Sequence, residues 1–142
     1  MYINPNKYKL STVKRGSKIF IQCLLRKKYI ELTPEEFIRQ IILNYINIDM
    51  DIPISRIAVE KGFEVNKRHK RFDAVIFDPN GNPYVLIECK KTGIELNENV
   101  VLQASNYNKV LKAPYLWLTN GANNRILEFK DEIYQEVSQI NF

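Results

Sequence analysis

The chain has 142 residues, 45% of them hydrophobic, which is enough to bury a core as one domain. Its two cysteines are too few for a disulfide framework and lack a metal-type spacing such as C-x-x-C, and no apolar run approaches the roughly 20 residues that cross a bilayer. We therefore expect a soluble cytoplasmic protein, and neither a secreted disulfide-stabilised protein nor a membrane-spanning one.

The net charge of +5 is distributed unevenly along the chain. Residues 1–30 hold eight Lys or Arg and no acid, whereas residues 31–142 hold thirteen bases against sixteen acids. The bases could neutralise nucleic-acid phosphates or could be solvated charge that maintains solubility, and charge alone leaves both readings open. Residues 1–17 are polar and without periodicity, so we expect an irregular basic arm there and a single domain over residues 18–142.

The first predicted elements are a short strand near residues 18–24 and a helix over the sequence LTPEEFIRQIILNYI. Thr33 is the expected N-cap, Pro34 occupies the first helical position, and Glu36 completes a capping box with Thr33. Apolar residues then recur at helical spacing, namely Phe37, Ile38, Ile41, Ile42 and Tyr45. The helix should end near residues 46–47.

Strand patterns dominate the middle and the end of the chain. Residues 56–65 predict a strand broken or bulged at Gly62, and residues 71–91 predict two strands joined by a turn. A second helix should start near Asn97 and stop before Pro114, with an apolar face made of Val100, Val101, Ala104, Tyr107, Val110 and Leu111. Two further strands flank the turn NGANN, and the tail from residue 131 fits no single element. This order predicts an α/β domain with a central mixed sheet flanked by helices.

The turn at Asn80-Gly81 sets the expected register of the two strands around it. This dipeptide favours a two-residue type I′ turn, in which both central residues have positive φ. The resulting pairs, all on one sheet face, are Phe77–Tyr84, Val75–Leu86, Asp73–Glu88 and Arg71–Lys90. Pro79 would lose a ladder hydrogen bond in this register, so a longer loop with the same centre is an alternative.

This register brings two carboxylates together. Asp73 and Glu88 would stand opposite each other with Cβ atoms about 5 Å apart, and their repulsion would be about 3 kcal/mol at an effective dielectric of 20. A divalent cation such as Mg²⁺ would reverse the sign of this interaction, and Lys90 on the same face could hold a water or stabilise phosphate charge. The alternative is a surface quartet in which Arg71 and Lys90 neutralise the two acids.

Three motifs carry a resemblance to known nucleases. Asp73, fourteen residues and then Glu88-Cys89-Lys90 resemble the D-x(n)-E-x-K motif of the PD-(D/E)XK nuclease superfamily, and QASNY at residues 103–107 resembles a Q-x-x-x-Y motif found in such nucleases. With the LTPEE helix before them, residues 18–130 resemble the N-terminal nuclease domain of the R subunit of type I restriction enzymes, in a compact stand-alone form. Two departures are Phe72, where a proline is expected, and the lack of an ATP-binding G-x-x-x-x-G-K-[ST] motif.

The resemblance implies a restriction-endonuclease-like fold and roles for individual residues. Asp73 and Glu88 would bind Mg²⁺ or Mn²⁺ with the Cys89 carbonyl as a third ligand, and Lys90 would be the catalytic lysine. Glu60 would be an additional site acid, or else a surface residue.

The resemblance also assigns residues on the two helices and around the strands. Glu36 resembles a first-helix acid that some superfamily members direct at the metal, although a capping-box role explains this residue fully. Gln103 and Tyr107 would reach the site or the DNA backbone. The alternative is that Tyr107 is a core residue and Gln103 a surface residue beside it. The expected nucleic-acid contacts are Lys67, Arg68, Lys70, Arg71, Lys91 and Tyr107.

The implied function is metal-dependent hydrolysis of DNA phosphodiester bonds in restriction or repair. Of the two modes of cleavage, the endonuclease is preferred over the exonuclease. The alternative is a catalytically silent DNA-binding or accessory subunit with the same fold. Expected partners are DNA, a second copy of the chain in a homodimer, and a separate translocase or modification subunit.

Overall fold

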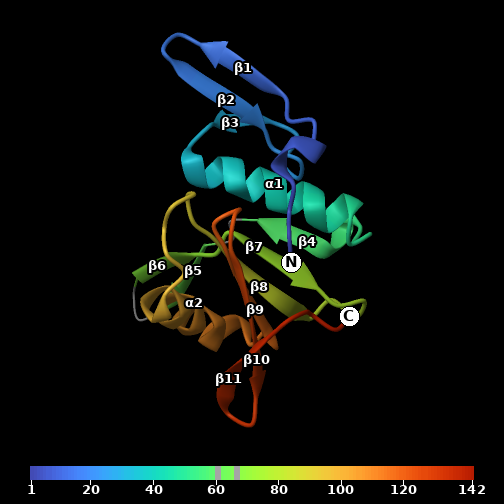
Figure 1. Cartoon of the computed structure of the whole chain (residues 1–142), viewed down its shortest axis with the longest axis vertical. Helices are drawn as coiled ribbons and strands as arrows, with labels where there is room; N and C mark the ends of the chain where they lie inside the picture. Colours follow the sequence, from blue (N-terminus) through green and yellow to red (C-terminus); the bar gives the residue numbers. More distant parts are fainter. Residues whose placement is uncertain (60–61, 66–67) are drawn as a thin grey trace.

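In the computed structural model the chain forms four layers: a small sheet, a helix, a larger sheet and a second helix (Figure 1). The structure describes residues 1–59, 62–65 and 68–142, and of residues 62–65 and 68–71 it describes the backbone alone. The elements in chain order are η1 (Pro5–Lys7), β1 (Thr12–Arg15), β2 (Lys18–Gln22), β3 (Tyr29–Glu31), α1 (Pro34–Ile48), η2 (Ile54–Arg56), β4 (Ile57–Val59), β5 (Gly62–Val65), β6 (Arg68–Arg71), β7 (Ala74–Phe77), β8 (Pro83–Cys89), α2 (Glu98–Leu111), β9 (Tyr115–Thr119), β10 (Asn124–Lys130) and β11 (Ile133–Val137).

The larger sheet has the strand order β11-β10-β9-β8-β7-β4. Strands β8 and β9 are parallel and are joined through α2, whereas the other neighbours are antiparallel. The expected α/β fold with a mixed sheet flanked by helices is therefore confirmed. Within the described ranges no helix combines the length and the apolar character needed to cross a membrane.

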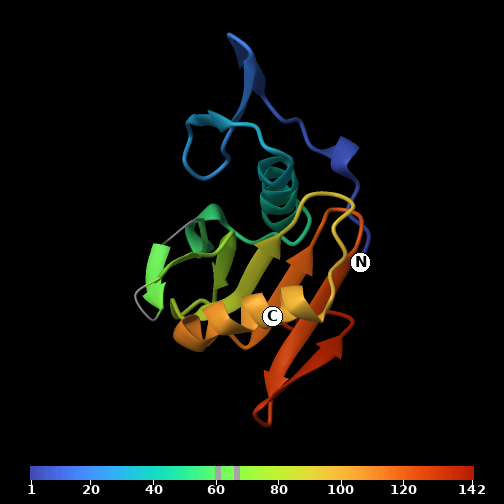
Figure 2. The same cartoon turned by 90° about the vertical axis from the view of Figure 1, so that its left-hand side faces the viewer.

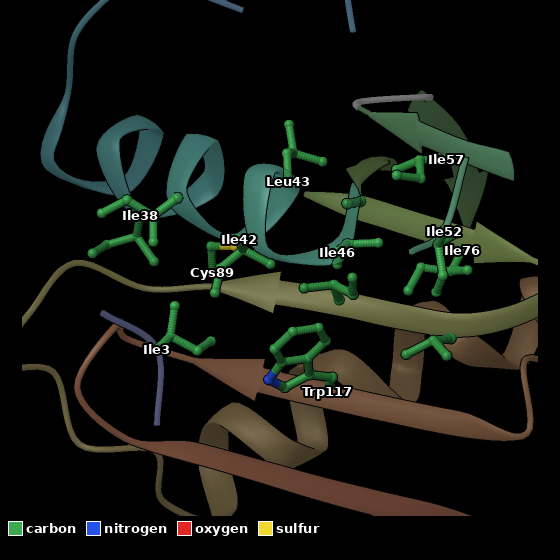
Figure 3. Packing of buried hydrophobic residues seen from close by; sticks show 14 of the residues in the cluster. Ile3, Ile38, Ile42, Leu43, Ile46, Ile52, Ile57, Ile76, Cys89 and Trp117 are labelled. Atoms are coloured by element: carbon green, nitrogen blue, oxygen red, sulfur yellow. The ribbon is translucent and has the colours of Figure 1, made fainter. Parts of the chain in front are cut away.

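Alternation along the strands divides the core between the two faces of this sheet. Ile87 of β8 faces α1, whereas its neighbour Leu86 faces α2, because successive strand side chains point to opposite faces. The cluster on the α1 face includes Ile38, Ile42, Ile46, Ile76, Cys89 and Trp117, which Figure 3 shows packed between helix and strands. The cluster on the α2 face includes Phe72, Val75, Leu86, Val100, Ala104 and Leu116.

Helix α1 is buried on more sides than its apolar stripe predicts. Thr33 is the N-cap, as expected, and its hydroxyl accepts the Glu36 N–H at 3.1 Å. Phe37 of the expected stripe is 40% exposed, whereas Gln40 is fully buried. The small sheet of β1–β3 covers the second side of α1, and there the backbone N–H of Leu24 donates to Gln40 Oε1 at 3.0 Å.

The expectation of an irregular arm over residues 1–17 is wrong for the segment Thr12–Arg15, which forms β1. This strand pairs with β2, the strand expected near residues 18–24, through a turn at Gly16 with φ of +61°. Ile3 and Tyr8 also join the core on the α1 face. The pattern TVKR is too short for its alternation to be distinguished from irregular sequence.

The turn between β7 and β8 is the longer alternative and not the type I′ turn. Of the two central residues only Gly81 has a positive φ, +85°, and the Asp78 N–H donates to the Asn82 carbonyl at 2.8 Å. Asp78 closes the loop, because its carboxylate accepts the N–H groups of Asn80 and Asn82. Pro79 suits the position directly after Asp78 in this loop, which explains why the longer loop forms in place of the two-residue turn.

A bulge between Ile76 and Phe77 compensates for the longer loop. From Ile76 towards the start of β7, the two strands therefore pair in the predicted register. Val75 faces Leu86 as expected, whereas Phe77 faces Pro83 and not Tyr84. The expected pairing of Arg71 with Lys90 is wrong. Arg71 ends β6, which pairs with β5 in a separate two-stranded sheet where Arg71 faces Gly62.

The second half of the chain follows the prediction closely. Helix α2 has Asn97 as N-cap and ends before Pro114. Val110, expected on the apolar face of α2, is 49% exposed. Asn108 is buried, and its side-chain amide is satisfied there because it bonds both the N–H and the carbonyl of Ala113. The tail, which fitted no single element, forms β11 against β10.

Substituting Gly121 tests the contact between the loop after β9 and α1. Gly121 has φ of +84°, and a Cβ there would lie 2.7 Å from Ile38 Cδ1. We expect Gly121→Ala to lower the free energy of unfolding by about 2–4 kcal/mol, as the sum of left-handed strain and overpacking. The measurement is urea denaturation.

Gly16→Ala is the matched control. Gly16 also has a positive φ, +61°, but no atom lies within 4 Å of its added Cβ, so only the strain of about 1–2 kcal/mol should remain. Equal losses in the two variants would show that the Ile38 contact does not constrain the loop.

Candidate active site

The candidate site lies where the end of β8 meets the start of β7, beneath the first turns of α1. Asp73 directly precedes β7, and its Oδ2 accepts the backbone N–H of Cys89 at 2.7 Å. The ladder between β7 and β8 therefore ends at Ala74–Ile87, one pair short of the expected Asp73–Glu88 pair, because a side-chain oxygen takes the place of a backbone acceptor. Asp73 is thereby fixed to the end of β8.

Glu88 is a buried carboxylate beside Asp73. It is only 7% exposed, and Lys90 Nζ lies 2.8 Å from its Oε1. Burial and then the negative charge of Asp73 raise the pKa of Glu88 to about 7, although Lys90 acts in the opposite direction. The two acids thus share one electrostatic environment, in which the charged form of Glu88 is disfavoured.

Lys90 remains an ammonium group at neutral pH. Burial lowers its pKa, but the hydrogen bond and the charge of Glu88 raise it more, and Glu35 and Asp73 add to this increase, so the net pKa is raised. A lysine held in this state supplies a fixed positive charge and hydrogen-bond donors next to the two acids.

A buried polar network on α1 supports Asp73. Arg39 donates through Nη2 to Asp73 Oδ1 at 2.5 Å, and through Nη1 to Glu36 Oε2. Gln40 Nε2 donates to the other Glu36 oxygen at 2.8 Å. The network therefore runs from the loop between β2 and β3 through Gln40, Glu36 and Arg39 to Asp73 and the end of β8.

Arg39 and Gln40 are not among the site residues predicted from the sequence. The available signal was the spacing of Glu36, Arg39 and Gln40, which puts three polar side chains on one side of an isoleucine-rich helix. Only half of the expected capping box forms. The Thr33 hydroxyl accepts the Glu36 N–H, whereas the Glu36 carboxylate bonds Arg39 and Gln40.

The first-helix acid whose charge reaches Glu88 is Glu35. Its negative charge raises the pKa of both Glu88 and Lys90, after larger contributions from burial and from neighbouring groups. Glu36, the expected candidate, is held by Arg39 instead. Glu35 is exposed, so its carboxylate is accessible to solvent beside the buried pair.

Helix α2 contributes Tyr107 to the other side of the site. Burial and then the charge of Glu88 raise the pKa of the Tyr107 phenol, and its ring also packs against the cluster on the α2 face. Tyr107 therefore packs against the core and also lies within the electrostatic influence of Glu88. Gln103, one turn earlier, and Lys91, after β8, are exposed.

The remaining predicted site residues receive no side-chain description. Glu60 and Lys67 lie outside the described residues. Arg68, Lys70 and Arg71 are described by their backbone alone, as parts of β6.

The donors at the site are of the kind that Mg²⁺ or Mn²⁺ prefers. The carboxylates of Asp73 and Glu88 and the Cys89 carbonyl are hard oxygen donors, and the Cys89 thiol is buried on the opposite face, where burial raises its pKa. Among the described residues, no group of three or more His, Cys, Asp and Glu side chains could hold a metal ion. A bound ion would therefore need the carbonyl, water or phosphate oxygens as well.

Comparison with known families assigns the chain. The family described as the N terminus of the type I restriction enzyme R protein matches residues 34–141. The chain belongs to this family. The matched region begins at the first residue of α1 and contains all the site residues described above, and a search of curated proteins finds no match.

The raised pKa of Glu88 predicts a pH dependence of stability for the metal-free protein. The pKa of Glu88 is about 7 in the folded protein against an ordinary value of 4.5, so folding favours the protonated acid. Its stabilising contribution is present below pH 4.5 and is lost as the pH rises through 7, which lowers the free energy of unfolding by about 3 kcal/mol. Denaturation in EDTA across this range measures the loss.

Glu88→Gln is the control, because glutamine keeps the shape of the side chain without its titration. The difference between wild type and this variant should change with pH between 4.5 and 7. A difference that stays constant over this range would contradict the raised pKa.

Proposed function

We propose that this protein is a divalent-metal-dependent nuclease of the PD-(D/E)XK type that hydrolyses DNA phosphodiester bonds in restriction. The observation that carries the proposal is the gathering of Asp73, Glu88 and Lys90 at adjacent strand ends, in a chain whose family is that of a restriction enzyme R protein. The restriction-endonuclease-like core is part of the same proposal, supported by the mixed sheet between two helices.

The electrostatics of the two acids support cation binding. Glu88 is buried next to a second carboxylate, and both conditions raise the free energy of its charged form. A divalent cation between the acids would remove this penalty, because it compensates both charges at once. The site is thus better suited to binding a metal ion than an exposed ion-pair quartet would be.

Each residue then has a distinct task. Asp73, Glu88 and the Cys89 carbonyl would hold Mg²⁺ or Mn²⁺, which when bound supplies Lewis-acid activation of water and phosphate. The Lys90 ammonium would orient the attacking water or stabilise negative charge on the phosphate. Arg39 acts as a positioning residue, because it holds one Asp73 oxygen while Cys89 N–H holds the other.

One observation favours a second candidate function. Arg39 and Lys90 already lie against Asp73 and Glu88, so the two acids have cationic partners without any metal. A catalytically silent DNA-binding or accessory subunit could retain this arrangement. Such a subunit would act with a separate translocase or modification subunit, whereas an active nuclease could cut both strands as a homodimer.

A cleavage assay distinguishes the two candidates. Supercoiled and linear DNA are incubated with Mg²⁺ or Mn²⁺ and wild-type protein, Asp73→Ala or Lys90→Ala. We expect both substitutions to reduce the cleavage rate by about 100-fold or more, because each removes a charge next to the reacting phosphate. EDTA should abolish cleavage by the wild type.

Lys130→Ala is the matched control, since Lys130 is an exposed lysine at the end of β10. It should cut at the wild-type rate. If Asp73→Ala and Lys90→Ala also cut at that rate, the site assignment is wrong. If no form cuts but all bind DNA in a salt-dependent way, the silent subunit is the correct function.

A further inference from the structure

Residues 1–33, which we call the N-terminal appendage, lie outside the region that matches the family. They form η1 and the three-stranded sheet of β1, β2 and β3. In both views this sheet lies on the far side of α1 from the larger sheet, and the β1–β2 hairpin projects away from the rest of the molecule (Figure 2).

The appendage carries the positive charge of the whole chain. It holds eight Lys or Arg and one acid, whereas residues 34–142 hold thirteen bases against fifteen acids. Within the appendage, Lys18 is paired with Glu31 and Lys7 with Asp49. The other exposed bases are Lys9, Lys14, Arg15, Lys27 and Lys28.

The exposed face of the hairpin combines cations with aromatic rings. The Arg15 guanidinium lies 5.3 Å from the ring centroid of Phe20 and 5.6 Å from that of Tyr29. Cation–π contacts of this kind hold the guanidinium in place while leaving its N–H groups available. Lys9 and Lys27 line a pocket of about 200 Å³ with Ser11, Gln22 and Asn44, which has room for a phosphate group and its waters.

The appendage is joined directly to helix α1, whose first turns carry residues of the candidate active site. Only Leu32 and Thr33 separate β3 from α1, and the Leu32 N–H donates to the Ile19 carbonyl at 2.8 Å. The first turns of α1 hold Glu35, Glu36 and Arg39. The appendage is therefore contiguous with the turn of α1 that carries these residues of the site.

We propose that the N-terminal appendage is a phosphate-binding arm that holds the DNA backbone beside the candidate active site. The substrate class rests on the proposed function, but the binding step does not require catalysis. The arm supplies the positive charge that the rest of the chain lacks, because the remainder is net acidic and its site is lined by carboxylates. Salt-dependent binding through lysine and arginine is the usual source of affinity for a DNA backbone.

The test is binding of a fluorescent 30-base-pair duplex in EDTA, where cleavage cannot occur. The appendage variant carries Lys9→Gln, Lys14→Gln and Lys27→Gln. The control variant carries Lys109→Gln, Lys112→Gln and Lys130→Gln, which change the net charge equally at exposed positions of the family-matched region. Circular dichroism establishes that both variants are folded.

We expect the appendage variant to raise the Kd at least about tenfold at 100 mM salt, and to reduce the slope of log K against log salt by about 0.9 for each lost phosphate contact. The control variant should change the Kd less than about threefold. Equal weakening in the two variants, or no weakening in either, would overturn the proposal, as would wild-type protein that binds anionic lipid vesicles but not the duplex.

This experiment separates the two proposals. If the appendage variant loses binding while no form of the protein cuts DNA, the arm is supported and the nuclease is not. If wild type cuts DNA but the appendage variant binds as well as wild type, the nuclease stands and the arm is wrong.

Discussion

The guanidinium of Arg39 between Glu36 and Asp73 is the interaction on which the site depends. It joins the first turns of α1 to the start of β7, and all three side chains are largely removed from water. Loss of one partner in such a buried set leaves uncompensated charge, which typically costs about 3–5 kcal/mol. Because Arg39 and the Cys89 N–H together fix both Asp73 oxygens, the position of Asp73 follows from the packing of α1 on the sheet. The raised pKa of Glu88 follows first from its burial in the same packing and then from the negative charge of Asp73.

The same region shows how an ordinary α/β core holds buried charged side chains at its edge. The alternation of β8 buries Ile87 towards α1 and Leu86 towards α2, so the strand is held on both faces up to its last residues. Glu88 and Lys90 then lie where this packing ends and polar groups from both helices converge. Rigid strands hold the acids within the region that matches the family, residues 34–141.

Local sequence patterns predicted the elements well, because their causes are local. The Thr33-Pro34 start of α1 and the Asn97 start of α2 are capping signals, and the register of Val75 against Leu86 follows from a turn centred near Asn80. The misses have non-local causes. Arg71 belongs to a second small sheet, β1 becomes a strand only through pairing with β2, and the partner of Arg39 is 34 residues away. The sequence predicts no role for Glu35, and Glu36 turns towards Arg39, which a helical wheel does not reveal.

The full burial of Gln40 has a consequence for how the molecule is assembled. Its amide group bonds Glu36 on one side and the Leu24 backbone on the other, so each end of one side chain is satisfied by a different part of the protein. Without the appendage, Gln40 Oε1 would lose this partner and α1 would expose the surface that the small sheet covers. The appendage is therefore not a detachable tail. It completes the solvent shielding of the central helix, and we expect the two parts to unfold as one cooperative unit.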